Sequence, residues 1–276
     1  MTRAPRWATT ALCTFVTAAL LLAGWQLAIS FSGLSPYLAK TPVDVWRYLF
    51  VDGAGNPADA AERRAALVPM IGVTLLHSAV GLLLGVSAGF VGAVALTVSR
   101  ALRSIFLPLA LLLQTVPLIA MAPVIYAVFG SGVLTAAVVA AVVTFFPLLM
   151  NIGAGLTSST PETTDLVRAY GGSRWTLLRF VQLPSSLPSL FAGLKLAAPA
   201  TVSAATLYEF LFSFEGLGAN LLTSKSYSDY GLLWTLVVVT VLLSLAAYGL
   251  VVAAETLLLA GRFPPRDPTL AQKGPA

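Results

Sequence analysis

Three long stretches without a charged residue limit the folds open to this chain more than any other feature. They lie between Arg64 and Arg100, between Arg103 and Glu162, and between Asp229 and Glu255. A membrane-spanning helix needs about 20 predominantly apolar residues, so the first and third stretches each have room for one span. The second stretch has room for two spans, with the Gly-Ser-Gly sequence at residues 130–132 as the turn between them.

The composition also indicates a membrane protein: 58% of the residues are hydrophobic and 10% are charged, whereas a soluble domain has about 25% charged residues. The apolar runs show no alternation of period two, which favours helices over an outer-membrane barrel. Helices also satisfy every backbone polar group within lipid. We therefore predict an all-α membrane protein with about six transmembrane helices, at residues 8–30, 67–98, 102–129, 133–156, 187–212 and 231–259.

The chain divides into three predicted parts. Residues 1–66 form an N-terminal anchor helix and an outer loop, residues 67–262 the transmembrane core, and residues 263–276 a short disordered cytoplasmic tail. The first apolar run exceeds the about 7–15 residues of a signal-peptide core, so we expect a retained anchor. In the outer loop, Thr41 followed by Pro42 predicts a short amphipathic helix over residues 43–50.

Lysine and arginine are unevenly divided between the two sides of this topology. With the N-terminus inside, ten lie in cytoplasmic segments, namely Arg3, Arg6, Arg100, Arg103, Arg168, Arg174, Arg179, Arg262, Arg266 and Lys273. Five lie on the other side, namely Lys40, Arg47, Arg63, Arg64 and Lys225. The positive-inside rule therefore predicts that both termini are cytoplasmic. The same asymmetry explains the net charge of +5, so this charge does not indicate nucleic-acid binding.

The sequence contains few residues that could form a disulfide or bind a metal. Cys13 is the one cysteine, which excludes an intramolecular disulfide and a cysteine-based metal site. His77 is the one histidine, so a histidine pair for a metal or a haem is also excluded. We expect this chain to bind no cofactor.

A charged insert at residues 165–184, DLVRAYGGSRWTLLRFVQLP, separates the fourth and fifth predicted spans. Asp165 complements the dipole at a helix start, and about one and a half turns of helix fit into residues 166–170. Gly171 and Gly172 then permit a sharp bend, where a side chain would block a close approach of the backbone.

The second half of the insert predicts another helix. Ser173 is a suitable N-cap for a helix over residues 174–181. Leu183 and Pro184 are expected to end this helix and to turn the chain into the fifth span, because proline cannot continue a helical hydrogen-bond ladder.

The insert resembles the cytoplasmic coupling loop of ABC importer permeases, whose pattern is Glu-Ala-Ala, three residues, Gly, nine residues, Ile, one residue and Leu-Pro. Asp165 takes the place of the Glu, and the residues at the required spacing are Gly171, Val181, Leu183 and Pro184. Leu166 and Val167 replace the alanine pair, which departs from the pattern. Further matches are Val116-Pro117-Leu118, Ala122-Pro123, Phe145-Phe146-Pro147, Asn151, Leu187-Pro188, Gly193, Lys195, Glu209-Phe210 and Gly216-Leu217-Gly218. From about residue 67 the chain resembles permeases of nitrate, sulfonate, taurine and thiamine-precursor importers.

This resemblance implies a permease subunit in the plasma (inner) membrane of a prokaryote, coupled to a separate ATPase through the insert. The coupling residues would be Asp165, Arg168, Ala169, Gly171, Gly172, Arg174, Leu183 and Pro184. The chain contains no Walker A pattern, so ATP and Mg would be used by the partner ATPase, present in two copies. A second permease copy, as a homodimer, and a periplasmic or lipid-anchored substrate-binding protein complete the implied assembly.

Ionisable residues within spans are candidate functional residues, because burying them costs ~2.5–3.5 kcal/mol on insertion scales. His77 is expected to be neutral and bonded to a neighbouring carbonyl. Lys195 is expected to snorkel to the cytoplasmic interface, with a role near the pathway as the alternative. Glu209 matches an acidic family position and is a candidate for a gating or structural role. Glu255 is expected at the interface.

Uncharged polar residues and prolines complete the pathway candidates. Gln114, Thr115, Asn151, Ser203 and Thr206 can line a pore, although hydrogen bonding between helices is the commoner role. Four prolines inside spans can bend their helices, namely Pro117, Pro123, Pro147 and Pro199. The predicted pathway or gate set is Gln114, Pro117, Asn151, Lys195 and Glu209.

The main alternative is a self-contained secondary transporter or channel. Such a protein needs pseudo-symmetric halves or membrane carboxylates, and here the inner spans have no Asp and only Glu209 and Glu255, near span ends. A membrane enzyme would need a nucleophile–base pair or metal ligands. Neither alternative explains the insert, so we favour a non-enzymatic permease for a small solute such as a sulfonate, nitrate, taurine or a pyrimidine (thiamine) precursor.

Overall fold

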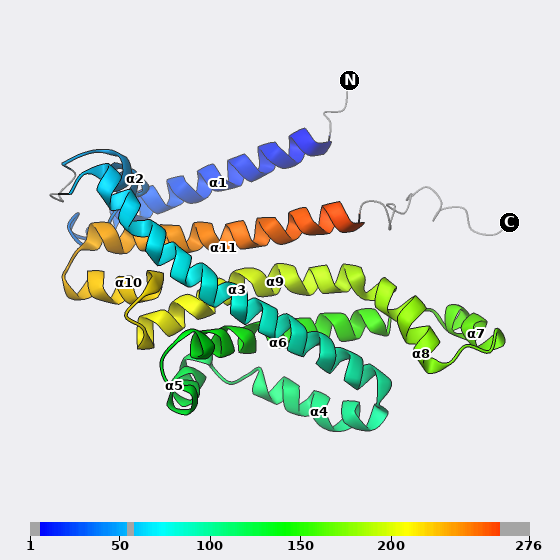
Figure 1. Cartoon of the computed structure of the whole chain (residues 1–276). Helices are drawn as coiled ribbons and strands as arrows, with labels where there is room; N and C mark the ends of the chain where they lie inside the picture. The colour runs from blue at the N-terminus through cyan, green and yellow to red at the C-terminus, as the bar shows by residue number, and fades with distance from the viewer. Residues whose placement is uncertain (1–5, 54–57, 260–276) are drawn as a thin grey trace, which may run out of the picture.

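The computed structural model describes residues 6–53 and 58–259, and these residues form helices and no strand (Figure 1). The longer helices are α1 (Arg6–Phe31), α3 (Ala60–Val98), α4 (Arg100–Leu113), α5 (Leu118–Phe129), α6 (Val133–Leu156), α9 (Leu183–Phe212) and α11 (Tyr230–Leu259). The shorter ones are α2 (Pro42–Phe50), α7 (Pro161–Ala169), α8 (Arg174–Leu177), the π-helical turn η1 (Leu178–Gln182) and α10 (Gly216–Ser226). The predicted all-α class is confirmed.

Five uninterrupted helical segments of the described chain are long and apolar enough to cross a membrane, and the bent pair of α4 and α5 makes a sixth. The pair covers the predicted span at residues 102–129, but its axis turns by 105° at the break. Pro117 lies at this break, because a proline lacks a backbone N–H and pushes the preceding residue out of the helical region. Pro123, Pro147 and Pro199 lie within helices that continue past them.

Close packing of α3 against α6 forms the centre of the molecule. Gly81, Gly85 and Gly89 repeat every four residues on one face of α3, and each of these positions meets α6. A Cβ atom at position 85 would lie 2.7 Å from Cγ2 of Thr144 and 2.9 Å from a backbone oxygen of α6. Small residues at this spacing let the backbones of two membrane helices approach closely.

Helix α9 also packs against α6. The hydroxyl groups of Thr144 on α6 and Thr201 on α9 form a buried hydrogen bond of 2.6 Å. Buried apolar side chains continue this contact along the helices, in one cluster with Leu148, Ile152 and Ala197 and in a second cluster with Ala136, Val139 and Tyr208.

One end of the molecule carries the short helix α2 against α3, as the outer-loop sequence predicts. Thr41 and Asp44 form a capping box at the start of α2, in which each satisfies a backbone N–H of the other. The buried Arg63 of α3 donates hydrogen bonds to three backbone carbonyls, those of Tyr48, Val51 and Ala58. Residues 58–66 therefore belong to this end structure and to α3, which begins before the predicted residue 67.

A short helix that the sequence analysis did not predict, α10, lies at the same end between α9 and α11 (Figure 1). Gly216, Leu217, Gly218 and Ala219 at its start are buried. Leu217 belongs to a third buried cluster with Leu67 of α3 and Leu236 of α11. The chain thus turns back into the helix bundle after α9 before it enters the last span.

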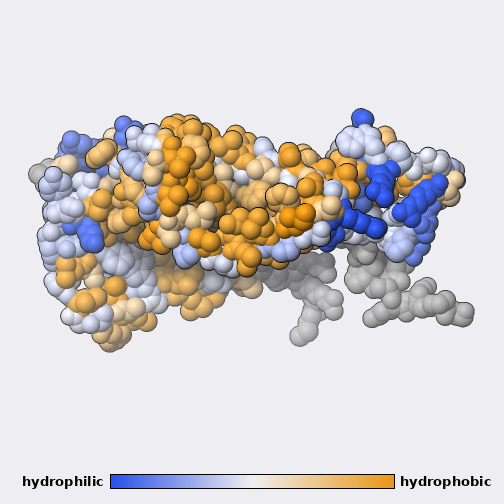
Figure 2. Space-filling view, turned by 90° about the horizontal axis from the view of Figure 1, so that it is seen from below, coloured by the Kyte–Doolittle hydropathy of each residue, from blue (hydrophilic) through white to orange (hydrophobic). Residues whose placement is uncertain are grey.

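The opposite end carries α7 and α8, which project beyond the long helices (Figure 1). Figure 2 shows an apolar middle between two more hydrophilic ends, as expected of a chain that crosses a membrane. Helix α1 begins and α11 ends on the side of the molecule where α7 and α8 project (Figure 1). The predicted disordered tail at residues 263–276 lies outside the described residues, as do residues 54–57 of the predicted outer loop.

Candidate functional site

The segment from Pro161 to Pro184, called the α7–α8 segment below, contains the predicted coupling insert. Helix α7 begins at Pro161, earlier than predicted, and its N-cap Thr160 accepts a hydrogen bond from the N–H of Thr163. Hydrogen bonds from the backbone and from the Thr160 side chain hold the pKa of Glu162, in the first turn, below its usual value. Glu162 therefore takes the place at the helix start that we expected for Asp165.

Asp165 and Arg168 lie one turn apart within α7 instead. Their side chains form an exposed ion pair of 3.6 Å along the helix. Exposed pairs of this kind contribute little to stability, so both charges remain available to a partner surface. Ala169, Tyr170 and Arg174 are exposed at the same end of the molecule.

The predicted bend after α7 is present. Gly171 has a φ angle of +74°, which an L side chain rarely adopts and which glycine adopts at no steric cost. A Cβ at position 172 would lie 2.5 Å from Cγ1 of Val167 and 2.8 Å from its carbonyl oxygen. The two glycines therefore let the chain fold back tightly against the last turn of α7.

The predicted N-cap Ser173 is also present, and its hydroxyl accepts a hydrogen bond from the N–H of Thr176. The prediction that Leu183 and Pro184 end this helix is wrong, because α8, η1 and α9 run on without a break from Arg174 to Phe212. The N–H of Leu183 bonds the carbonyl of Leu178, five residues earlier. This π-type turn shifts the hydrogen-bond ladder just before Pro184, where a proline has no N–H to donate.

The α7–α8 segment consists of a direct extension of the membrane helix α9, formed by α8 and η1, and of α7, which the tight turn at Gly171 and Gly172 joins to that extension. Its exposed face combines arginines with large apolar side chains, namely Leu166, Tyr170, Trp175 and Phe180. Such a patch, apolar with a charged rim, is typical of a protein–protein contact surface.

The break between α4 and α5 forms a second candidate site. A cavity of about 440 Å³ is lined by Gln114, Thr115, Val116 and Pro117 from the break and by Phe146 and Pro147 of α6. The predicted pathway residues Gln114 and Pro117 therefore lie together here. Asn151 does not line this cavity; its side-chain amide donates a hydrogen bond of 2.8 Å to the carbonyl of Pro147 in the same helix.

Lys195 has an ion-pair partner that the sequence analysis did not predict. Its Nζ atom lies 3.0 Å and 2.8 Å from the two carboxylate oxygens of Glu255 on α11, with both side chains mostly buried. This ion pair joins α9 to α11. The expectation of an interfacial Glu255 missed this partner, because the two residues are 60 positions apart in the sequence.

Glu209 is fully buried near the end that carries α10. Its carboxylate accepts hydrogen bonds from the Thr74 hydroxyl (2.7 Å) and from the N–H of Gly218 (3.0 Å), and it lies 2.8 Å from Nδ1 of His77. The Thr74 hydroxyl in turn accepts a hydrogen bond from the N–H of Leu217. Together these residues form what we call the Glu209 cluster, which joins α3 and α9 to the first turn of α10.

The expectation that His77 bonds a neighbouring carbonyl is wrong, because Glu209 is its partner. Gly216 explains why α10 can approach so closely: its φ angle is +91°, and a Cβ there would clash with the carboxylate of Glu209. The sequence signal for this cluster was a carboxylate within a span, but its partners on α3 were not visible in the sequence.

Comparison with known proteins assigns this arrangement to a family. Residues 81–258, which extend from α3 into α11, match the model of the binding-protein-dependent transport system inner membrane component. The chain is 28% identical over 229 residues to a probable ABC transporter permease protein of Haemophilus influenzae, covering 83% of this chain and 89% of that protein.

Two further relatives carry substrate names. A riboflavin transport system permease protein of Chloroflexus aurantiacus is 33% identical over 146 residues, 53% of this chain and 54% of the relative. A formylaminopyrimidine transport permease protein of Halalkalibacterium halodurans is 28% identical over 199 residues, 72% of this chain and 75% of the relative. With its membrane-spanning helices and the matched residues 81–258, the chain belongs to the family of inner membrane components of binding-protein-dependent transport systems.

Proposed function

We propose that this chain is the permease subunit of an ATP-driven importer and that the α7–α8 segment couples it to a separate ATPase. The observation that carries the proposal is the unbroken helix from Arg174 to Phe212. A partner that moves α8 would move α9 with it, because the two belong to one continuous helix, and α7 is joined to α8 by the tight turn at Gly171 and Gly172. Nucleotide-dependent movement outside the membrane would thereby reach the centre of the bundle.

The proposed coupling residues have distinct parts in this lever. Asp165, Arg168, Ala169 and Arg174 supply the exposed docking surface, together with the apolar side chains around them. Gly171 and Gly172 hold α7 against the start of α8. Leu183 and Pro184 lie where the π-type turn joins the lever to α9, and such turns are frequent at functional sites.

The proposed assembly contains two copies of the ATPase, a second copy of this chain as a homodimer, and a periplasmic or lipid-anchored substrate-binding protein. ATP and Mg would be used by the ATPase and not by this chain. Both termini and the α7–α8 segment would lie in the cytoplasm. The arginine-rich composition of that end supports this orientation.

The proposed pathway passes the break between α4 and α5, where Gln114 and Pro117 line the cavity. The Glu209 cluster would support a gate at the end of the molecule that carries α10. Lys195 is balanced by Glu255, so it does not supply a free cation for an anionic solute. The amide of Gln114 and the hydroxyl of Thr115 favour a neutral heterocycle, such as a pyrimidine precursor, over nitrate, a sulfonate or taurine.

Affinity purification of the tagged chain from its native membranes tests the coupling proposal, with Gly171→Trp as the variant. Gly53→Trp is the matched control, because both glycines have a positive φ angle and open space around the missing Cβ, but they lie at opposite ends of the molecule. We expect an ATPase to copurify with the wild type and with the control, and to be lost with Gly171→Trp. A chain that purifies alone and transports its solute in liposomes without ATP would instead establish a channel or secondary transporter.

The substrate proposal is tested separately, by uptake in cells that depend on this chain. Labelled aminopyrimidine is expected to accumulate, and excess unlabelled aminopyrimidine, but not taurine or nitrate, is expected to compete. Uptake of taurine, nitrate or a sulfonate with no effect of aminopyrimidine would contradict the substrate class and leave the coupling proposal intact.

A further inference from the structure

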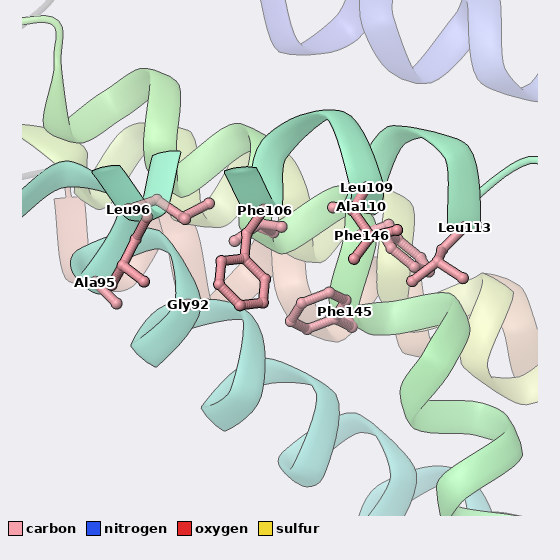
Figure 3. Close-up of a pocket in the computed structure, with 11 residues that line it drawn as sticks. Gly92, Ala95, Leu96, Phe106, Leu109, Ala110, Leu113, Phe145 and Phe146 are labelled. Atoms are coloured by element: carbon pink, nitrogen blue, oxygen red, sulfur yellow. The ribbon is translucent and has the colours of Figure 1, made fainter. Parts of the chain in front are cut away.

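Helix α4 stands apart from the rest of the bundle and leaves a cavity of about 330 Å³ between itself, α3 and α6 (Figure 3). The lining is apolar, with Leu96 of α3, Phe106 and Leu109 of α4, and Phe145, Phe146 and Leu149 of α6 among its residues. In Figure 3, Phe106 and Phe145 lie in the space between the helices. None of the residues of α4 is buried by the protein itself.

A second cavity, of about 250 Å³, continues the first toward the beginning of α4. The two adjoin at Leu96 and Leu149, which line both, and together we call them the α4 groove. In contrast to the first cavity, the second has polar groups in its lining, namely Thr97, Arg103 and Thr157. The α4 groove is therefore an apolar slot with a cationic end.

Arg103 is exposed, and among the residues that the structure describes it has no ion-pair partner. It lies one turn after Ser99, the residue at which α3 gives way to α4. The junction of α3 and α4 lies toward the end that carries α7 and α8 (Figure 1), which the positive-inside rule places at the boundary of the membrane. An unpaired guanidinium at such a boundary attracts a phosphate group, which it can bind with two hydrogen bonds.

We propose that the α4 groove binds one anionic phospholipid from the leaflet on the side of α7 and α8. An acyl chain would fill the apolar slot beside Phe106 and Phe145, and the phosphate would bind Arg103. The slot opens within the apolar part of the molecule, so the ligand must be a membrane component with an apolar chain. The cationic end selects an anionic headgroup over a zwitterionic one.

The bound lipid would hold α4 in place. No residue of α4 is fully buried, although Ala110 packs partly buried against the core, so a chain in the groove would add to the packing of α4. Helix α4 leads directly into the break at Gln114, so the lipid would also set the position of one wall of the cavity at the break.

Native mass spectrometry of the assembly, purified in mild detergent and supplied with phosphatidylglycerol or phosphatidylcholine, tests the headgroup. Arg103→Gln is the variant and Arg100→Gln the matched control, because both arginines are exposed in the first turn of α4 and only Arg103 lines the groove. We expect Arg103→Gln to weaken retention of phosphatidylglycerol about tenfold, since a charge-assisted hydrogen bond is lost. Arg100→Gln should leave retention unchanged. Equal loss in both variants, or no loss in either, would overturn the proposal.

A substitution that fills the apolar slot tests whether an acyl chain occupies it. Ala110→Phe places a ring in the cavity and is expected to reduce the retention of both lipids, whatever the headgroup. Unchanged retention would contradict the proposal.

A second copy of the chain is the competing occupant. With Cys13→Ser as the background, Leu109→Cys should form no disulfide between two copies on oxidation if a lipid fills the groove. An efficient disulfide between two copies at position 109 would show that the groove is a subunit interface and would overturn the lipid proposal.

Discussion

The Glu209 cluster determines how α10 is fixed to the bundle. Three groups on two elements, the Thr74 hydroxyl and the His77 ring of α3 and the N–H of Gly218 of α10, converge on one buried carboxylate. An anion at the first turn of a helix is favoured because the N-terminal N–H groups there have no partner within the helix. The carboxylate of Glu209 therefore does for α10 what an N-cap side chain does for other helices.

Removing this carboxylate should destabilise the protein. Glu209→Ala leaves Thr74, His77 and Gly218 without their buried acceptor, and each unsatisfied buried group costs about 1–3 kcal/mol. We expect the free energy of unfolding of the purified chain in detergent, followed by thermal unfolding, to fall by at least about 1–3 kcal/mol. Glu215→Ala, at an exposed residue six positions later, is the control and should leave the midpoint nearly unchanged. Equal midpoints for the two variants would show that the cluster contributes nothing.

The ion pair of Lys195 and Glu255 should show coupling in a double-mutant cycle. Lys195→Ala and Glu255→Ala each leave one mostly buried charge without its partner, whereas the double variant leaves neither. The double variant should therefore be more stable than the sum of the single losses predicts, by about 0.5 kcal/mol or more. Strictly additive losses in the unfolding midpoints would mean that the pair contributes no specific interaction.

At this scale the sequence identified the residues but not their partners. Glu209 and Lys195 stood out because charges within spans are costly. Their partners Thr74, His77 and Glu255 lie 60 or more positions away. Only the packing of α3, α9 and α11 brings these residues together, and hydrophobic runs do not encode which helices become neighbours.

Among the elements, the contact between α3 and α6 depends most on a sequence pattern. The glycines at positions 81, 85 and 89 leave no room for side chains at the helix crossing. Their spacing of four residues is the small-residue pattern of membrane helix interfaces. This signal was present in the sequence and would have predicted the face of α3 that packs on another helix.

A side chain at this crossing should separate the helices. Gly85→Val places its Cβ and methyl groups against Thr144 of α6, and overpacking of this kind costs about 1–3 kcal/mol. Gly72→Val is the matched control, since it lies in the same helix with no atom near the added Cβ. The midpoint of thermal unfolding should fall clearly for Gly85→Val and change little for Gly72→Val. The reverse order would exclude this crossing as the tight contact.

Helix boundaries were predicted best where a glycine-rich turn precedes an apolar run, as at residues 130–132. The span at residues 133–156 has the predicted ends. Helix α10 was missed because its 11 residues mix polar and apolar side chains and form no apolar run. The continuation of α8 into α9 was missed because a proline usually ends a helix, and the π-type turn that accommodates Pro184 has no signature in the sequence.

In the proposed topology of the whole molecule, the α7–α8 segment and the α10 end face opposite sides of the membrane. Two exposed tyrosines mark these ends, Tyr170 with 85% and Tyr227 with 83% of its surface exposed. In a Cys13→Ser background, Tyr227→Cys should react with a membrane-impermeant maleimide in intact spheroplasts. Tyr170→Cys should react only after permeabilisation, because the positive-inside rule places the arginine-rich end in the cytoplasm. The opposite labelling pattern would invert the proposed topology.

Site-specific photocrosslinking directly tests the proposal that the α7–α8 segment couples this chain to an ATPase. A benzophenone amino acid replaces Tyr170 in the α7–α8 segment, and in a parallel variant it replaces Tyr227 at the other end, where the side chain is equally exposed. We expect position 170 to crosslink to an ATPase polypeptide in native membranes and position 227 not to do so. An ATPase crosslink at position 227 and none at position 170 would contradict coupling through the α7–α8 segment.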